Sequence, residues 1–396
     1  MAEQYYSRIT GKDYKSIAKA AKQGLTSLDI ELTERCNLNC IHCCINLPEN
    51  DSSAISRELS IENIKEILKQ AVSLGCLTVR FTGGEPLLRE DFEELYIFAR
   101  RLGLRVMLFT NAVRITSKLA KLFSRNPPLE KIEVSVYGLT EKSYEGVTLK
   151  PGKFQAAMQG INLLLENKIP FVVKSAFLPP NRNEIDKMKK WANSLPWMER
   201  PMLFPMHFNL RVRRDSSQKN RMIEKLRVPP QEAVKYRVKK RNNIIEMKNY
   251  ISRFMGFQGS RLFTCRMGVQ SGCVDAYGFF QPCLLCKHPK TSYDLKQSSL
   301  EKAVKEFMPE ILALEAKNKD YLARCARCFL YGLCEQCPGR SWTEHGTLDT
   351  PVDYFCQLAH EEAKQLGLIS DNENAWEVKQ WQSRVKDFVG NEKNEN

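Results

Sequence analysis

The chain has 396 residues, of which 43% are apolar, and it carries a net charge of +14. Such a length can build two or three domains with real cores. No run of about 18 apolar residues occurs, which argues against a transmembrane helix, and the polar residues 1–16 lack the apolar stretch of a signal peptide. We therefore expect a cytoplasmic protein without a membrane span.

Apolar periodicity and capping residues predict alternating strands and helices along the first half of the chain. A short helix over residues 14–22 comes first. The expected strands are 28–32, 77–81, 105–109, 131–136, 170–177 and 202–207, and the expected helices are 61–74, 91–102, 116–123, 154–165 and 184–195. This alternation predicts an α/β fold with a parallel sheet of six strands, curved into a partial, TIM-like (β/α)6 barrel. Active sites of such folds lie at the C-terminal ends of the strands.

Composition changes divide the chain into five expected segments. These are an N-terminal helical extension (1–27), the partial barrel (28–210), a basic bridging segment (211–262), a cysteine-rich domain (263–360) with a helical stretch over 300–316, and a C-terminal helix and tail (361–396).

The fourteen cysteines are unevenly distributed. Five lie within residues 36–76 and nine within 265–356, with none in the 188 residues between. Disulfides do not persist in a reducing cytosol, so clustered cysteines indicate metal or redox ligands. The sequence therefore predicts two metal-binding regions that flank a metal-free middle.

The first cysteine cluster, Cys36-x3-Cys40-x2-Cys43, supplies three thiolates on one short loop. Three soft ligands leave one iron of a four-iron cluster without a protein ligand. A structural zinc ion would need four closed ligands. Cys44 could be the fourth, although adjacent cysteines rarely reach the same metal. The triad therefore favours an iron–sulfur cluster with one open iron.

Two motifs resemble those of the radical S-adenosylmethionine (SAM) family. Residues 34–43 are similar to its cluster-binding loop, with His42 at the position usually held by an aromatic ring. Residues 83–86, directly after the second expected strand, are similar to its motif for the amino group of SAM. Glycines let backbone carbonyls approach an ammonium closely, and a carboxylate supplies counter-charge. The residues of this motif are Gly83, Gly84, Glu85 and Pro86.

The resemblance extends more loosely over residues 28–207 and implies a chemistry. Asn111, Ser135 and Lys174 lie on the third, fourth and fifth expected strands, at positions where the family contacts SAM. The family's open iron binds SAM, and one electron cleaves it to methionine and a 5′-deoxyadenosyl radical that abstracts hydrogen from a substrate. The electron donor would be a flavodoxin or ferredoxin. No catalytic acid, base or hydrogen donor is assigned.

The C-terminal cysteines include the dense run Cys325-x2-Cys328-x5-Cys334-x2-Cys337. By itself this run is compatible with a zinc ribbon or with one or two iron–sulfur clusters. Together with three further cysteines it resembles the SPASM domain of one radical SAM subfamily, although the last gap is one residue shorter than usual. The resemblance implies two auxiliary four-iron clusters, the first on Cys265, Cys283 and Cys337, the second on Cys325, Cys328, Cys334 and Cys356.

The first auxiliary cluster would then lack a fourth ligand. Either Cys273 or Cys286 supplies it, or the iron is open to a substrate thiolate, which would suit thioether formation. With the cluster of the first triad, the chain would carry three four-iron clusters.

Between residues 211 and 261, fifteen Lys and Arg stand against four Asp and Glu. This segment is either a solvated helical bridge or a surface for an anionic partner. Few aromatic residues are interleaved with the charges, so we expect no nucleic acid partner.

SPASM relatives most often modify peptides or proteins, so the leading hypothesis is oxidation, cross-linking or thioether formation on a peptide or protein side chain. The alternative within the family is dehydrogenation or epimerisation of a small molecule. From another class, the chain could be an iron–sulfur electron carrier or a zinc-stabilised binding module. The glycine motif argues against that class, because a carrier has no use for a SAM pocket.

Overall fold

The computed structural model describes residues 24–198, 205–238, 248, 250–251, 253–264 and 270–390. The chain divides into two compact units, Met1–Leu226 with Arg266–Pro309, and Arg227–Cys265 with Glu310–Asn396. This division differs from the expected segments, because residues 266–309 and the start of the basic segment belong to the first unit. The helix expected over residues 14–22, the ligand Cys265 and the basic residues 239–241 lie outside the described residues.

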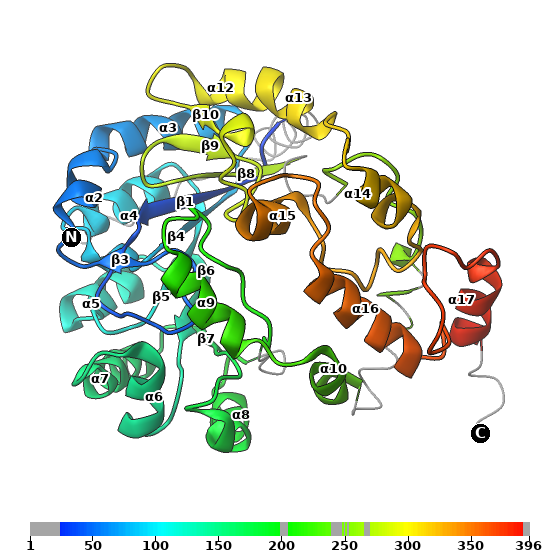
Figure 1. Ribbon diagram of the computed structural model, residues 1–396. Coiled ribbons are helices and arrows are strands. Elements are labelled where there is room, and N and C mark those ends of the chain that lie inside the picture. Colours follow the sequence, from blue (N-terminus) through cyan, green and yellow to red (C-terminus); the bar gives the residue numbers. More distant parts are fainter. Residues whose placement is uncertain are drawn as a thin grey trace. The chain divides into compact units, whose positions relative to one another are not determined.

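The first unit contains an eight-stranded sheet in the order β10-β9-β8-β1-β4-β5-β6-β7 (Figure 1). Its parallel part runs from β8 to β7, while β9 and β10 add antiparallel pairs. The strands are β1 (Ser27–Thr33), β4 (Thr78–Gly83), β5 (Arg105–Thr110), β6 (Leu129–Ser135), β7 (Phe171–Lys174), β8 (Ser271–Val274), β9 (Phe279–Gln281) and β10 (Tyr293–Asp294). The expected partial barrel and its first five strands are confirmed.

The sixth expected strand, 202–207, is not found in residues 205–207, which form no regular strand. A backbone hydrogen bond from Phe177 N–H to Pro205 O (3.0 Å) joins this segment to the chain that follows β7. The opposite side of β1 is instead extended by β8, which the sequence reading had assigned to the cysteine-rich domain.

The helices expected between the strands are also present. Ser60 and Thr116 each accept a hydrogen bond from a backbone N–H of the first helical turn, which fixes where two of them begin. Two helices, α2 and α6, had no counterpart in the sequence reading. The helices of this part are α2 (Ser52–Arg57), α3 (Ile61–Ser73), α4 (Phe92–Arg101), α5 (Ser117–Arg125), α6 (Glu141–Thr148), α7 (Lys153–Glu166), α8 (Ile185–Asn193) and α9 (Ser217–Leu226).

Alternation along the strands separates an apolar face from a polar one. On β4, Val79 and Phe81 are fully buried, and the Phe81 ring lies 6.2 Å from that of Phe92 on α4. Arg80 therefore points to the opposite face, where its guanidinium pairs with Asp29 of β1 at 2.9 Å. Helices cover the apolar face (Figure 1), which leaves the polar face to line the inside of the partial barrel.

The second unit is mainly helical. Its core includes Ile251, Leu330 and Ala363, and the ring of Trp381 stacks on Phe329 at 5.6 Å. Its helices are α10 (Pro230–Val238), α14 (Lys319–Ala323), η5 (Cys325–Arg327), α15 (Pro338–His345), α16 (Asp353–Gln365) and α17 (Trp381–Gly390). The stretch expected to be helical over 300–316 consists of α12 (Leu300–Lys302), a π-helical turn η4 (Ala303–Phe307) and α13 (Met308–Leu312).

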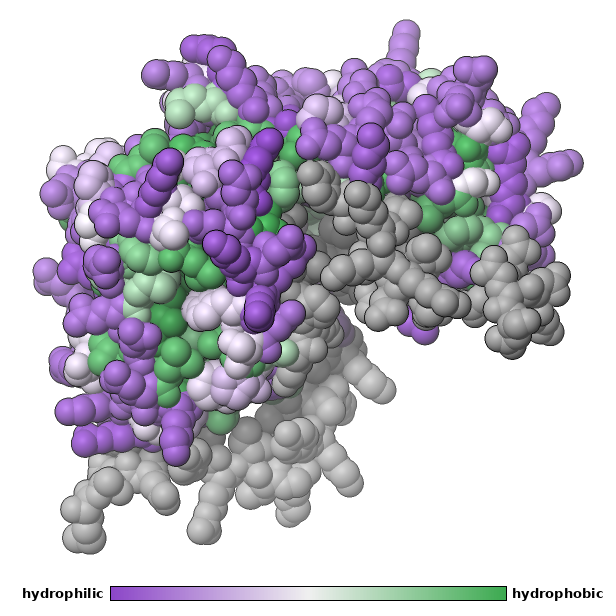
Figure 2. All heavy atoms as spheres, turned by 90° about the horizontal axis from the view of Figure 1, so that it is seen from below, coloured by the Kyte–Doolittle hydropathy of each residue, from purple (hydrophilic) through white to green (hydrophobic). Residues whose placement is uncertain are grey.

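Hydrophilic side chains make up most of the surface seen in Figure 2, and apolar side chains gather in smaller areas between them. Among the described residues, no helix has both the length and the apolar character needed to cross a membrane.

The packing of β4 on α4 gives a stability prediction. Phe81→Ala removes a fully buried ring, so we expect the free energy of unfolding to fall by about 3–5 kcal/mol in urea titrations followed by circular dichroism. Leu77→Ala, just before the same strand, removes a side chain that is 40% exposed and should cost under about 1 kcal/mol. Equal losses for both variants would contradict this assignment of the core.

Candidate metal centre and cofactor site

The first cysteine triad lies on the loop that follows β1. Cys36 and Cys40 are buried, Cys43 is half-buried, and the three pack with Leu38 in one cluster. Burial raises the pKa of the Cys40 thiol well above its usual value, and the nearby Cys43 and Cys36 raise it further. The structure therefore brings the three predicted ligands together in a site sheltered from water.

Several N–H groups point at the sulfur atoms of this triad. The backbone N–H groups of Leu38 and Asn46 donate to Cys36 Sγ and Cys43 Sγ, each at 3.4 Å. The side-chain Nδ2 of Asn111 lies 3.8 Å from Cys36 Sγ. Such donors favour the thiolate form and tune the potential of thiolate-bound iron.

The donor chemistry fits an iron–sulfur cluster. Two buried thiols and one half-buried thiol form a soft ligand set, and two buried polar atoms beside them, Asn37 Nδ2 and His42 Nδ1, have no hydrogen-bond partner. Among the described residues, no group of three or more Cys, His, Asp or Glu side chains is arranged to hold a single metal ion. The assignment of an iron–sulfur cluster to this loop therefore depends on the chemistry of its three thiol ligands.

The glycines of the 83–86 motif are required by the chain's own packing. A Cβ atom on Gly83, whose φ is +124°, would lie 2.1 Å from Thr33 O, and one on Gly84 would lie 2.2 Å from Arg35 O. Gly84 N–H also donates to Thr33 O at 2.8 Å, and Glu85 N–H to Arg35 O at 2.9 Å. These contacts hold the motif against the start of the cluster loop. The sequence alone does not predict this packing role of the glycines.

Glu85 is fully buried and joins the ends of two strands. Its carboxylate accepts hydrogen bonds from Thr110 Oγ1 (2.9 Å), Asn111 N–H (2.8 Å) and Leu87 N–H (3.1 Å). Burial raises its pKa to about 7, against the lowering effect of these bonds. Pro86 begins the short turn η1 (Pro86–Leu88) that follows. The sequence reading missed Thr110, which stands out only once β4 and β5 are seen to be neighbours.

Asn111 lies at the cluster loop, where its Nδ2 donates to Asn37 Oδ1 at 2.8 Å. Ser135 ends β6 and is half-buried there. Lys174 is the register partner of Ser135 on the neighbouring strand β7, and its ammonium pairs with Glu133.

His42 packs among aromatic rings. Its ring lies 4.9 Å from that of Tyr137 and 5.2 Å from that of Phe208. Burial lowers its pKa to about 4, so the imidazole is neutral near pH 7. It therefore packs as a neutral aromatic ring, the role that the resemblance implies for this position.

The first set of predicted auxiliary ligands is divided between the units. Cys283 belongs to the first unit and Cys337 to the second, while Cys265 lies outside the described residues. Of the two candidates for the fourth ligand, Cys273 lies on β8, where burial raises the pKa of its thiol and the nearby Glu31 and Cys283 raise it further. Cys286 Sγ lies 3.3 Å from Thr291 Oγ1. This ligand set stays a prediction.

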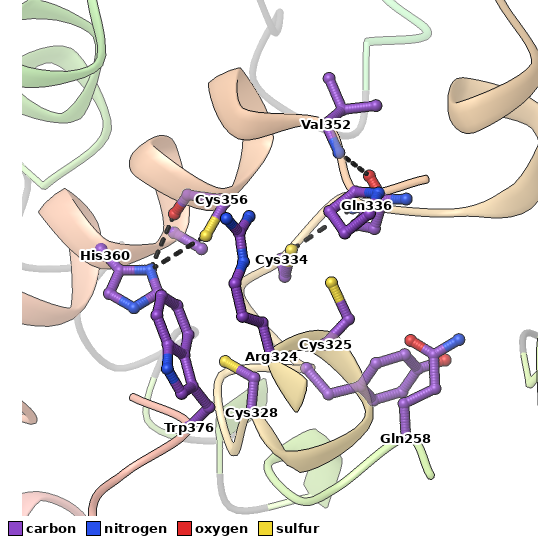
Figure 3. Close-up of a pocket in the computed structure, with 13 residues that line it drawn as sticks. Gln258, Arg324, Cys325, Cys328, Cys334, Gln336, Val352, Cys356, His360 and Trp376 are labelled. Atoms are coloured by element: carbon purple, nitrogen blue, oxygen red, sulfur yellow. Dashed lines mark hydrogen bonds between the residues drawn. The ribbon is translucent and has the colours of Figure 1, made fainter. Parts of the chain in front are cut away.

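The second set of predicted auxiliary ligands lines one pocket of the second unit (Figure 3). The pocket encloses about 500 Å³, part of it open to solvent. Its sulfur atoms come from η5, from the segment after it and from α16. Their residues are Cys325, Cys328, Cys334 and Cys356. A pocket with four thiols is the donor set that a closed four-iron cluster needs.

His360, which the sequence reading missed, orients one of these thiols. Its Nε2 accepts the N–H of Ala375 at 3.2 Å, so the hydrogen-bond pattern assigns the ring proton to Nδ1. Nδ1 then donates to Cys356 O at 2.9 Å and lies 3.7 Å from Cys356 Sγ (Figure 3). Both ring nitrogens are engaged within the chain, so His360 positions Cys356.

The idea of an anion-binding surface is wrong for two arginines of the basic segment. Arg213 is paired inside the first unit with Glu34 (2.6 Å) and Asp275 (2.8 Å). Arg211 is 5% exposed and makes a bidentate ion pair with Asp215, with both hydrogen bonds at 2.8 Å. These cations neutralise the chain's own carboxylates.

Comparison with known proteins places the site in a family. Residues 30–192 match the model of the radical SAM superfamily. The AdoMet-dependent heme synthase of Methanosarcina barkeri is 31% identical over 165 residues, which is 42% of this chain and 46% of that protein. The probable GTP 3′,8-cyclase of Methanosarcina mazei is 33% identical over 168 residues, 41% of this chain and 49% of that protein. The chain thus spans about half the length of these curated relatives.

Solved structures share the fold over more of the chain. Native anSMEcpe with bound AdoMet and the Cp18Cys peptide covers 93% of this chain and 99% of its own, with a TM-score of 0.60 and 17% identity. SuiB of Streptococcus suis bound to S-adenosylmethionine covers 88% of this chain and 81% of its own, with a TM-score of 0.56 and 17% identity. The cluster loop, the glycine motif and strands β4 to β7 all lie within the matched region, so residues 30–192 form a radical SAM domain.

Proposed function

We propose that this chain is a radical SAM enzyme that abstracts hydrogen from a peptide or protein side chain. The observation that carries the proposal is the packed triad of Cys36, Cys40 and Cys43 beside the Gly83–Pro86 turn. A four-iron cluster on three thiolates would keep one iron for SAM, whose reductive cleavage supplies a 5′-deoxyadenosyl radical.

The chain's own residues would bind the cluster and orient SAM. Leu38 and Asn46 donate N–H groups to two of the thiolates. Glu85 holds the end of β5 beside the loop through Thr110 and Asn111. Such a rigid frame keeps SAM in one geometry relative to the polar inner face of the sheet, where a substrate would lie.

Further SAM contacts are proposed from the family positions. His42, Gly83, Gly84 and Pro86 lie at the loop and at the turn packed on it, and Ser135 ends the fourth strand. Lys174 is a weaker candidate, because Glu133 already pairs with it.

A peptide substrate is favoured by the extent of the shared fold. The neighbour with a TM-score of 0.60 has a peptide bound and matches 93% of this chain, including the second unit. The four-thiol pocket of the second unit also suits an auxiliary cluster of a SPASM domain. We therefore infer three four-iron clusters and oxidation, cross-linking or thioether formation on a side chain.

A small-molecule substrate is the second candidate. The sequence relatives that match the barrel include a heme synthase and a GTP cyclase, whose names point to a porphyrin and a nucleotide. Both candidates need an electron, for which we propose a flavodoxin or ferredoxin. Cysteine-bound clusters also need a reducing compartment, which favours the cytoplasm.

The first prediction of this proposal concerns SAM cleavage. Cys40→Ala should reduce dithionite-dependent 5′-deoxyadenosine to background and remove about four irons per chain, because one cluster ligand is lost. Anaerobic reconstitution, iron analysis and chromatography of the products would measure both. Cys76→Ala is the matched control, since the Cys76 thiol is buried and donates to Thr78 O. An active Cys40→Ala variant, or bound zinc without SAM cleavage in the native chain, would refute the enzyme assignment.

The second prediction concerns the auxiliary clusters. The native chain should bind about twelve irons, and Cys328→Ala with Cys334→Ala should bind about four fewer. The signal of the SAM-binding cluster in electron paramagnetic resonance should persist in this variant. An unchanged iron content would remove the pocket of the second unit from the proposal.

The third prediction identifies the hydrogen donor. The reconstituted chain is incubated with SAM, dithionite and either a deuterated peptide pool or a deuterated pool of nucleotides and porphyrins. Deuterium should enter 5′-deoxyadenosine from the peptide pool, because the radical takes hydrogen from its substrate. Mass spectrometry reads out the transfer. Transfer from the small-molecule pool alone would replace the peptide by the second candidate while leaving SAM cleavage intact.

A further inference from the structure

The start of the basic segment lies against the cluster loop. Val212 N–H donates to Cys44 O at 3.0 Å, and Arg211 Nη1 donates to Asn46 O and to Asn46 Oδ1 at 3.1 and 3.2 Å. Asn46 in turn gives its backbone N–H to Cys43 Sγ. We call residues 211–220 the strap, since they hydrogen-bond the cluster loop along residues 39–46.

Lys219 is the second anchor of the strap. Its Nζ donates to Cys40 O at 2.8 Å and to Asn39 Oδ1 at 3.3 Å. The side chain comes from the first turns of α9 and is half-buried. Its ammonium therefore reaches the backbone of a predicted cluster ligand directly.

The two cations of the strap, Arg211 and Lys219, differ in whether a carboxylate lies beside them. Arg211 is neutralised by Asp215 through two hydrogen bonds of 2.8 Å. Within the described part of the chain, no carboxylate lies within ion-pair distance of Lys219 Nζ, whose partners are a carbonyl and an amide oxygen. A half-buried charge without an opposite charge is costly, and its neighbours on the other side are the thiol groups of the loop.

An anionic group on the triad would supply the missing compensation. Three thiolates around a cluster leave the loaded site with a net negative charge, and an added electron increases it. A fixed cation beside that charge stabilises the reduced form more than the oxidised form. This reasoning rests on the proposed cluster, but on no particular substrate.

We propose that Lys219 is a positioning residue of the strap that raises the reduction potential of the cluster held by Cys36, Cys40 and Cys43. The basic segment thus acts in part on the chain's own cluster loop. Lys219 contacts neither SAM nor substrate in this proposal. It acts through its hydrogen bond to the loop backbone and through the electric field of its ammonium group.

The test compares Lys219→Gln, which removes the charge, with Lys219→Arg, which keeps it. Lys225→Gln is the matched control, because Lys225 lies on the same helix and is exposed. The full chain is reconstituted anaerobically without SAM, its iron is counted, and it is titrated with reductant under electron paramagnetic resonance. The signal that is followed is the one that Cys40→Ala abolishes.

At the native midpoint potential, Lys219→Gln should lower the ratio of reduced to oxidised cluster by about tenfold, while Lys219→Arg and Lys225→Gln stay near the native ratio. Loss of iron in Lys219→Gln with retention in Lys219→Arg would also support a need for the cation. A native ratio in a fully loaded Lys219→Gln would overturn the proposal, as would loss of iron in both Lys219 variants. Absence of any signal sensitive to Cys40→Ala would instead refute the proposed function.

Discussion

The structure of the site depends on the contact between two backbone segments. Gly83 and Gly84 lie so close to Thr33 and Arg35 that neither position has room for a Cβ atom. This contact brings the end of β4 onto the start of the cluster loop. Glu85 then holds the end of β5 beside them through its hydrogen bonds to Thr110 and Asn111. Loop, turn and strand ends therefore form one rigid body, in which a shift of one part would displace the thiols.

A buried charge network surrounds the other side of the loop. Lys287 pairs with Glu31 and Glu34, and Arg213 bridges Glu34 to Asp275, all at sites with little or no exposure of the carboxylates. Burial raises the pKa of Glu31 to about 7 even with Lys287 beside it. Removing one member of such a network leaves an uncompensated charge in a poorly hydrated site. The network explains why cations from distant parts of the sequence are engaged inside the first unit.

Local sequence was sufficient to predict the barrel and the triad, because periodicity, capping and cysteine spacing are read over short windows. It was insufficient for contacts made across long separations. The motif predicts that Gly84 contacts SAM, but it does not reveal that the missing Cβ of Gly84 also makes room for the backbone of Arg35. The arginines of the strap were counted as surface charge, because nothing near them in sequence reveals partners such as Glu34. Residues 202–207 have the apolar character of a strand, but regular pairing of 205–207 with β7 does not form.

The pairing of β1 with β8 has a consequence for biosynthesis. Ser27 pairs with Ser271, and the cation that neutralises Glu31 and Glu34 is Lys287. When only the first five strands have left the ribosome, the nascent chain therefore has an unpaired edge on β1. Glu31 and Glu34 are then without their lysine. Long-range pairing of this kind is slow, and open edges attract other chains. The charge network around the cysteine loop is thus complete only after residue 287, with about three quarters of the chain, has been made.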